Sequence, residues 1–160
     1  MTDTPATQHA ATDAGETRAP ADAAAAEALR AMTDAARGTL IERMGIELTE
    51  VTPERVAATM PVEGNTQPYG LLHGGASVVL AETLGSIAAM LHAGEGRVAV
   101  GVDINATHHR GVRSGVVHGV ATPAHRGRTS ATYDVVVLDA KDRRVCTARI
   151  TCAILDRPSR

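Results

Sequence analysis

A single carboxylate and a histidine stand out in the stretch QPYGLLHGGASVVLAETLGS, which covers residues 67–86. His73 and two glycines precede a segment of almost wholly apolar residues, within which Glu82 is the only side chain with a full charge. An ionised carboxylate in an apolar setting is costly unless it is paired, hydrogen-bonded or neutralised. Glu82 is therefore either a structural residue that reaches polar partners or a carboxylate that acts as a base or nucleophile.

The segment His73-Gly74-Gly75 could bind an anion or a developing oxyanion if it starts a helix. Glycines let a ligand approach the backbone closely, and the first N–H groups of a helix have no intrahelical partner. A plain turn before a helix would explain the same three residues, so both interpretations stay open at this point.

Spacing separates the histidine from the glutamate. Nine helical residues turn through about 900° and rise roughly 13 Å, which leaves His73 and Glu82 on opposite faces of one helix. If both serve one reaction, the helix start of one subunit must meet the mid-helix of another, and a twofold dimer would supply two such sites. Ser86, four residues after Glu82, shares its face and could orient the carboxylate or hold a water molecule.

Hydrophobic periodicity predicts the elements that position these residues. Two strand-like segments, residues 45–51 and 55–62, precede an apolar segment at 71–91 that has the length of a helix and is apolar on every side. Four alternating segments with turn-rich separators follow, at residues 97–108, 115–125, 129–139 and 144–155. We expect consecutive hairpins in one antiparallel sheet around a helix that is buried all round, an α+β fold.

Composition assigns the N-terminal region. Residues 1–24 are mainly Ala, Thr, Asp, Pro and Gly without periodicity, so we expect a disordered tail before a single domain over residues 25–157. The alanine-rich stretch that opens the domain predicts a helix, which Gly38 interrupts before a shorter turn.

Charge and composition limit the partners. The formal net charge of −2 and the presence of only two tyrosines among the aromatic residues argue against binding of nucleic acid. No charge-free apolar run reaches the roughly 18 residues of a membrane span, and the N-terminus lacks the basic start and apolar core of a signal peptide. The seven histidines show no zinc-ligand spacing. We expect a cytoplasmic protein without a nucleic-acid, membrane or metal partner.

The stretch QPYGLLHGGASVVLAETLGSIAA resembles the signature of hotdog-fold acyl-CoA thioesterases of the phenylacetate-pathway type. It is most similar to the 1,4-dihydroxy-2-naphthoyl-CoA thioesterases of menaquinone synthesis and to the enterobactin-pathway proofreading thioesterases. The resemblance continues in AATMPV, in GVDINATHHRGVRSGVVHGVATPAHRGR and in RRVCTARITCAIL, and it covers about residues 29–155. It implies the hotdog fold, in which an antiparallel sheet of about six strands wraps around one long central helix.

The resemblance implies roles for five residues at the thioester. Gln67 matches the side chain that helps to bind the attacking water or the thioester, and His73 matches the residue that steadies the thioester and the leaving sulfur. The N–H of Gly74, with Gly75 beside it, matches the donor that polarises the carbonyl. Glu82 matches the catalytic carboxylate, which comes from the neighbouring subunit and acts either as nucleophile or as general base on water.

Further positions follow from the same resemblance. Ser86 matches a Ser or Thr that contacts the catalytic carboxylate. His108, Arg110 and Arg128 match positions near the substrate or CoA, whose phosphates suit cationic side chains, although solvated surface would explain these cations equally well. The resemblance implies no metal and no cofactor beyond the CoA of the substrate, because an activated thioester needs an aimed water or carboxylate and an oxyanion donor worth roughly 3–4 kcal/mol in kcat.

We therefore expect an acyl-CoA thioesterase that releases free acid and CoA from an aromatic substrate, such as a hydroxynaphthoyl- or hydroxybenzoyl-CoA, or from a medium-chain one. Helix geometry predicts a dimer, and the resemblance implies a homotetramer. One alternative is a non-catalytic acyl-CoA-binding hotdog module, which would not need Glu82. Another is a hotdog dehydratase or hydratase, whose Asp and His pair belongs to a loop pattern that we do not find. Tyr69, where relatives often carry Phe or Trp, is expected to adjust the acyl pocket.

Overall fold

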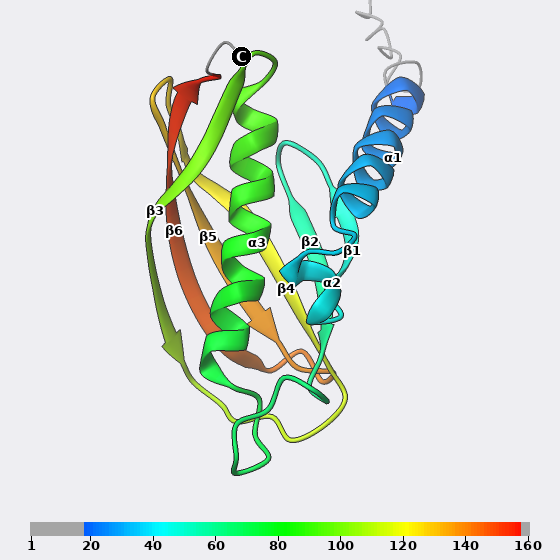
Figure 1. Cartoon of the computed structure of the whole chain (residues 1–160), viewed down its shortest axis with the longest axis vertical. Helices are drawn as coiled ribbons and strands as arrows, with labels where there is room; N and C mark the ends of the chain where they lie inside the picture. Colours follow the sequence, from blue (N-terminus) through cyan, green and yellow to red (C-terminus); the bar gives the residue numbers. More distant parts are fainter. Residues whose placement is uncertain (1–17, 158–160) are drawn as a thin grey trace, which may run out of the picture.

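The structure, a computed structural model, describes residues 18–157. A six-stranded antiparallel sheet curves around one long helix, and a further helix lies beside the sheet edge (Figure 1). The elements in chain order are α1 (Arg18–Ala35), α2 (Leu40–Arg43), β1 (Glu47–Val51), β2 (Val56–Pro61), α3 (Gly74–Ala93), β3 (Arg97–His108), β4 (Val116–Arg126), β5 (Ser130–Leu138) and β6 (Arg144–Asp156). The predicted α+β hotdog architecture is confirmed.

The ends of α3 follow from local chemistry. His73 is its N-cap, and the Nδ1 atom of His73 accepts a hydrogen bond of 2.8 Å from the Gly75 N–H. At the other end Gly94 has a φ of 74°, a left-handed conformation that glycine adopts without strain. The helix predicted over residues 71–91 is thus confirmed, with its start and end two to three residues later.

Alternation along the strands turns one face of the sheet toward α3. Every second residue of β5 is buried, from Ala131 through Tyr133 to Val137. Two glycines let the helix lie close to the strands: a Cβ on Gly85 would stand 2.1 Å from the Cγ2 of Ile150, and one on Gly119 would stand 2.6 Å from a Leu84 methyl. The core therefore lies between α3 and the concave face of the sheet.

The strand order corrects the expectation of consecutive hairpins. The order across the sheet is β1-β2-β4-β5-β6-β3, and every neighbouring pair is antiparallel. β3 pairs with β6 at one edge, while β4 pairs with β2 on the far side of α3. Residues 109–115 therefore cross the end of the sheet where α3 begins, and this crossing brings them beside the residues just before α3.

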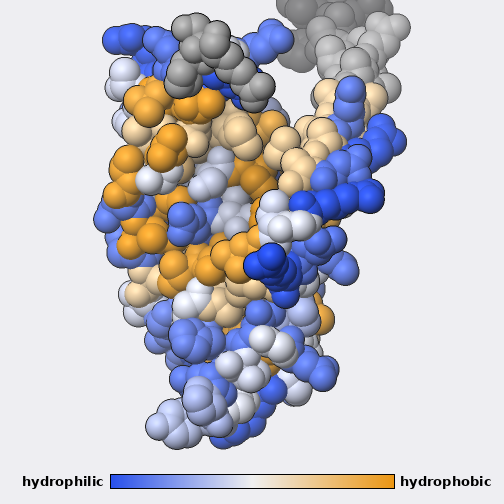
Figure 2. Space-filling model, in the orientation of Figure 1, coloured by the Kyte–Doolittle hydropathy of each residue, from blue (hydrophilic) through white to orange (hydrophobic). Residues whose placement is uncertain are grey.

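The burial of α3 also differs from the prediction. Its buried residues occupy the side that faces the sheet, whereas Glu82 and Met90 on the other side are exposed, Met90 by 42%. Figure 2 shows apolar side chains gathered over this open side, and Val100 and Val102 of β3 are 48% and 63% exposed. By length and hydropathy alone α3 could cross a membrane, but half of its apolar window is buried within the domain. A helix that is apolar all round has therefore one side covered by the sheet and one side open in this chain.

The predicted tail of residues 1–24 needs a partial correction. Residues 1–17 lie outside the described residues, but residues 18–24 belong to α1. The cause is local: proline is tolerated in the first turn of a helix, and Pro20 is followed by an alanine run with the highest helix propensity. As predicted, the helix stops before Gly38, whose φ is 73°, and the shorter α2 follows.

Candidate active site

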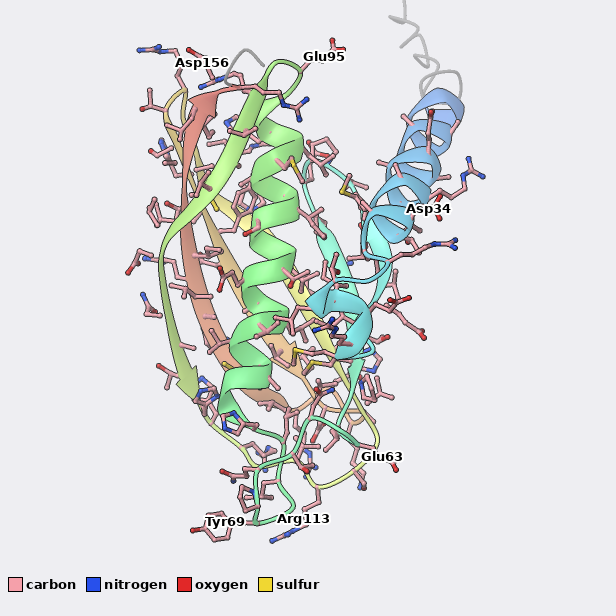
Figure 3. The ribbon with its side chains drawn as sticks, in the orientation of Figure 1. Asp34, Glu63, Tyr69, Glu95, Arg113 and Asp156 are labelled. Carbon is pink, nitrogen blue, oxygen red and sulfur yellow. The ribbon has the colours of Figure 1, made fainter. Side chains whose placement is uncertain are left out.

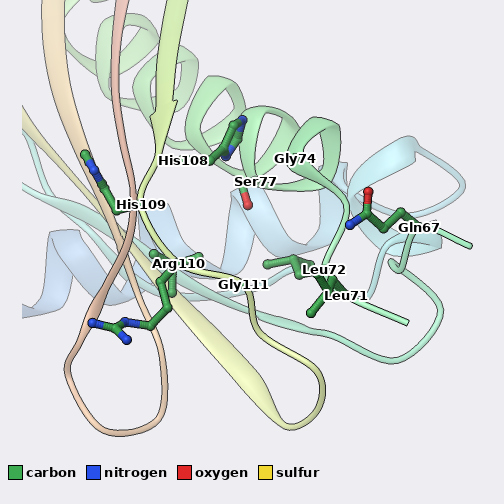
Figure 4. A pocket seen from close by; sticks show the side chains of 10 residues that line it. Gln67, Leu71, Leu72, Gly74, Ser77, His108, His109, Arg110 and Gly111 are labelled. Carbon is green, nitrogen blue, oxygen red and sulfur yellow. The ribbon is translucent and has the colours of Figure 1, made fainter. Parts of the chain in front are cut away.

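The start of α3 forms one wall of a cavity of about 410 Å³, which we call the Gly74 cavity (Figure 4). Four of the predicted site residues line it: Gln67, Gly74, His108 and Arg110. In Figure 4 His108 lies against the first turn of α3, and Arg110 extends away from Gln67. The remaining lining residues are Leu71, Leu72, Ser77, His109, Gly111 and Val145. The structure thus brings together residues from the loop before α3, from α3 itself and from the end of β3.

Backbone hydrogen bonds fix the loop that carries Gln67. The Asn65 side chain donates to the carbonyls of Met44 and Pro61, at 2.8 and 2.9 Å, and the Asn65 carbonyl accepts from the His73 N–H at 2.9 Å. Within the loop, the Gln67 N–H donates to Leu71 at 2.8 Å, which closes a short turn. Gln67 therefore stands on a rigid support beside the N-terminus of α3.

Gly74 combines a free donor with a close neighbour. Its N–H is the first of α3 and has no acceptor among the described residues. The helix dipole makes this N–H attractive to developing negative charge. A Cβ at this position would lie 2.9 Å from the His108 Nε2, so a larger residue would displace the His108 ring from its place beside the donor.

Glu82 and Ser86 line a different cavity of about 410 Å³, which we call the Glu82 cavity. Its polar residues are Glu82, Thr83 and Ser86, and its apolar residues are Leu40, Ile41, Val79, Ile87, Met90 and Ala99. The Glu82 cavity and the Gly74 cavity share no lining residue. Glu82 is exposed and also borders a smaller cavity of about 150 Å³ against β3. The carboxylate and the candidate oxyanion donor are therefore separate within one chain.

Beneath this carboxylate lies a buried thiol. Burial raises the pKa of Cys152, a hydrogen bond with Ser86 opposes that rise, and the negative charge of Glu82 adds to it. The two cysteines, Cys146 and Cys152, are both buried and free. Ser86 thus lines the Glu82 cavity on the open side of α3 and also contacts the buried Cys152 in the core.

Three further predicted site residues line neither the Gly74 cavity nor the Glu82 cavity, namely His73, Gly75 and Arg128. The ring of His73 folds back on its own helix, and the Gly75 N–H is taken up by the same contact. Arg128 lies in the turn between β4 and β5, where its carbonyl accepts a hydrogen bond from Arg97. That turn sits at the C-terminal end of α3, since the His92 Nε2 is 2.9 Å from the Gly127 carbonyl oxygen. Arg128 therefore lies at the C-terminal end of α3, whereas His108 and Arg110 lie at the N-terminal end.

Among the lining residues of the Gly74 cavity that the sequence analysis did not single out, Ser77 is a buried polar one. Ser77 is 2% exposed and stands in the first turn of α3, three residues after Gly74. Its signal was a hydroxyl among apolar residues directly after the glycine pair, on the same helical face as Gly74. Across residues 18–157 no group of three or more His, Cys, Asp and Glu side chains is arranged to hold a metal ion.

Comparison with known proteins gives the family. The Thioesterase superfamily matches residues 69–146. The chain is 48% identical to the proofreading thioesterase EntH of Cronobacter turicensis over 128 residues, which are 79% of this chain and 93% of that protein.

Solved structures agree. A thioesterase of Haemophilus influenzae, HI1161, superposes with a TM-score of 0.77 at 38% identity, over 80% of this chain and 90% of that one. A mutant of thioesterase PA1618 from Pseudomonas aeruginosa gives a TM-score of 0.78 at 38% identity, over 81% and 94% of the two chains. These relatives favour a hydrolase over a non-catalytic binding module. The chain belongs to the thioesterase superfamily and is a hotdog-fold thioester hydrolase.

Proposed function

We propose that this thioesterase hydrolyses an acyl-CoA with an aromatic or medium-chain acyl group in a site shared by two subunits. The observation that carries the proposal is the division between the Gly74 cavity and the Glu82 cavity, which have no residue in common. Eight residues of α3 separate Gly74 from Glu82, a rise of roughly 12 Å. A carboxylate that acts on a carbonyl held at Gly74 must therefore come from a second copy of the chain.

In the proposed reaction the thioester carbonyl oxygen accepts a hydrogen bond from the Gly74 N–H, which stabilises the charge that develops there. Glu82 of the second subunit takes a proton from water, whose oxygen adds to the carbonyl carbon, and the C–S bond then breaks. Alternatively Glu82 attacks that carbon itself and displaces the CoA thiolate, and water then hydrolyses the resulting mixed anhydride, which releases the free acid, the Glu82 carboxylate and a proton. On either route the CoA thiolate takes up the proton. Gln67 orients the water or the thioester, and Ser86 orients Glu82.

The tautomer of His73 suits a role at the leaving sulfur. Because its Nδ1 accepts the Gly75 N–H, the neutral ring carries its proton on Nε2. Nε2 is therefore a hydrogen-bond donor, and we propose a thioester sulfur beside the helix start as its acceptor. His108 and Arg110 are proposed to bind the CoA, while Arg128 can contribute only from a neighbouring subunit because it lies at the far end of its own chain.

The open side of α3 supports self-association. Met90 lines the Glu82 cavity and Val102 lines the smaller cavity beside Glu82, and these two large apolar residues are 42% and 63% exposed. Their cover by a second copy would remove this surface from water, which is favourable. We propose a dimer built on this side, within a homotetramer, acting in the cytoplasm with no cofactor besides the CoA of the substrate.

The deciding experiment measures thiol release from a panel of aromatic and aliphatic acyl-CoAs by wild type, Glu82→Gln and Glu95→Gln. Loss of the carboxylate is expected to lower kcat by about 10²–10⁴-fold, the usual contribution of general acid–base catalysis. Glu95, an exposed residue in the turn after α3, is the matched control and should leave kcat unchanged (Figure 3). A fully active Glu82→Gln variant would refute the assignment, and turnover of neither substrate class by folded wild type would refute the proposed substrates.

Mixing two inactive variants tests the shared site. In a heterodimer of Glu82→Gln with Gln67→Ala, one site has both substitutions and the other has none. Co-refolding equal amounts should therefore restore roughly a quarter of wild-type activity for a twofold dimer. Heterodimers that form, as shown by co-purification of two tags, but stay inactive would mean that both residues act within one chain.

A further inference from the structure

A second cavity opens beside the Gly74 cavity and is rich in cations. It measures about 240 Å³ and lies between residues 111–114 and residues 139–143, and we call it the Lys141 cavity. Its charged residues are Arg113, Asp139, Lys141 and Arg143. Gly111 borders both cavities, so the two cavities are neighbours. Arg113 belongs to the stretch THHRGVRS that also carries His108 and Arg110, whereas Lys141 and Arg143 lie about 30 residues further along the chain, so the sequence does not reveal that these cations meet.

Backbone hydrogen bonds hold the first wall of this cavity in place. The Arg110 N–H donates to the Val145 carbonyl at 3.3 Å, which ties the end of β3 to the start of β6. Further along, Val112 accepts from the Leu72 N–H at 2.7 Å, and Gly115 accepts from the Val62 N–H at 2.9 Å. Residues 110–115 are thus fixed to three other segments.

Asp139 holds the second wall. This carboxylate is 4% exposed and accepts hydrogen bonds from the N–H groups of Lys141 and Arg143, at 2.9 and 3.0 Å, and from the Arg143 guanidinium. The Arg143 hydrogen bond is the main cause that lowers the Asp139 pKa to about 2, so Asp139 carries a full charge at neutral pH. Asp139 therefore neutralises Arg143, and the cavity keeps the charges of Arg113 and Lys141.

An exposed aromatic ring stands next to these two cations. Tyr69 is 81% exposed at the tip of the closed turn that carries Gln67. The Nη1 of Arg113 lies 3.5 Å from the Tyr69 carbonyl oxygen, and Figure 3 shows both side chains at the same end of the molecule. The only other aromatic residue of the chain, Tyr133, is fully buried. From the sequence we expected Tyr69 to adjust the acyl pocket. Within one chain, however, Tyr69 does not line the Glu82 cavity.

We propose that the Lys141 cavity binds phosphate groups of the CoA nucleotide through Arg113 and Lys141, and that the Tyr69 ring stacks on its adenine. This inference rests on the proposed acyl-CoA function and assigns the nucleotide to residues beyond His108 and Arg110. A nucleotide with several phosphates needs cations that are not neutralised by the protein, and hydrogen bonds from ionised donors to phosphate are strong. An exposed ring on a rigid turn offers a stacking surface at little entropic cost.

The test compares acyl-CoA with the matching acyl-pantetheine, which has the same thioester but no nucleotide. Arg113→Gln and Lys141→Gln should each raise the KM for acyl-CoA about tenfold, the loss of one good phosphate contact. Tyr69→Ala should raise this KM about fivefold or more, while Tyr69→Phe keeps the ring and should match wild type. None of these variants should change kcat, nor the KM for acyl-pantetheine.

Arg30→Gln is the control for net charge, because Arg30 is an exposed cation on α1 away from the cavity. Competition by adenosine 3′,5′-bisphosphate, weakened by Lys141→Gln, would confirm the nucleotide as the ligand. The inference is overturned if Lys141→Gln and Arg113→Gln leave the acyl-CoA KM unchanged, or if they raise the KM of both substrates equally. Failure of wild type to cleave acyl-pantetheine and acyl-CoA alike would instead refute the proposed function.

Discussion

Replacing Gly85 by alanine tests the contact that sets the height of α3 above the sheet. The new Cβ would lie 2.1 Å from the Cγ2 of Ile150, whereas two carbon atoms attract best at about 3.5–4.0 Å. Either α3 or Ile150 must therefore shift by more than about 1 Å. Ile150 is 1% exposed and branched at Cβ, so it has few rotamers by which to move aside.

Two effects of opposite sign decide the size of the change. Overpacking a dense core costs typically about 1–3 kcal/mol, and the short distance here favours the upper end of that range. Alanine regains about 1 kcal/mol because its helix propensity exceeds that of glycine. We expect Gly85→Ala to lower the free energy of unfolding by about 1–2 kcal/mol, which corresponds to a fall in Tm of roughly 3–6 °C.

Urea denaturation at one fixed protein concentration measures this free energy, because association also shifts apparent stability. Gly101→Ala is the matched control, since its Cβ would stand 3.6 Å from the Glu82 Oε1 and 3.8 Å from the Ile150 Cδ1, both ordinary contacts. It should change stability by no more than about 0.5 kcal/mol. A displaced α3 also moves Glu82, so Gly85→Ala should lower kcat as well.

A double variant, Gly85→Ala with Ile150→Ala, tests the same contact from both sides. Ile150→Ala removes the clashing Cγ2, so the alanine at position 85 partly fills the space that it leaves. The double variant should therefore be more stable than the sum of the two single losses predicts, by about 1 kcal/mol or more. A Gly85→Ala variant as stable as wild type, or losses that simply add, would refute the close packing of α3 on β6.

Three further predictions rest on buried polar groups. Asp139→Asn should destabilise the fold at pH 6. The difference in Tm between this variant and wild type should shrink as pH falls, because the stability that ionised Asp139 contributes is full above its ordinary pKa of 3.8 and is lost as the pH approaches about 2. A Tm difference that does not depend on pH would contradict the Arg143 contact. Burial raises the pKa of Cys146 and Cys152, so both thiols should react with Ellman's reagent slowly in the native protein and rapidly in urea, and fast native labelling would show that they are accessible. Tyr133→Phe removes a buried hydrogen bond of 3.0 Å to a backbone carbonyl of α3 and should cost about 1 kcal/mol in urea unfolding, whereas an unchanged midpoint would mean that the hydroxyl contributes nothing.

Periodicity and turn residues were enough to predict the elements. The strands of the second half of the chain lie within one residue of the predicted bounds, because alternation records which residues face the core. The apolar length of residues 71–91 predicted α3, and the structure sets its ends at Gly74 and Ala93, between the His73 cap and Gly94. These signals are local, and each depends on a residue and its near neighbours in the chain.

Strand pairing and exposure could not be predicted from the same signals. β3 pairs with β6 rather than β4, and the backbone hydrogen bonds that join strands do not depend on side-chain identity. The Lys141 cavity depends on this pairing, because it places residues 111–114 beside the turn between β5 and β6. An apolar helix likewise does not reveal whether its second side is covered by its own sheet or by another chain.

Glu82 is exposed in the structure, although its neighbours in the sequence are apolar. In a single chain the carboxylate faces solvent, so it bears little of the cost that an apolar setting imposes on a charge. In the proposed dimer the apolar residues around it, Met90 and Val102 among them, would be removed from water and would take the carboxylate with them. Association would then place Glu82 in apolar surroundings and beside a carbonyl in one step. On this view the apolar side of α3 links assembly to catalysis, and the free subunit holds an unreactive carboxylate.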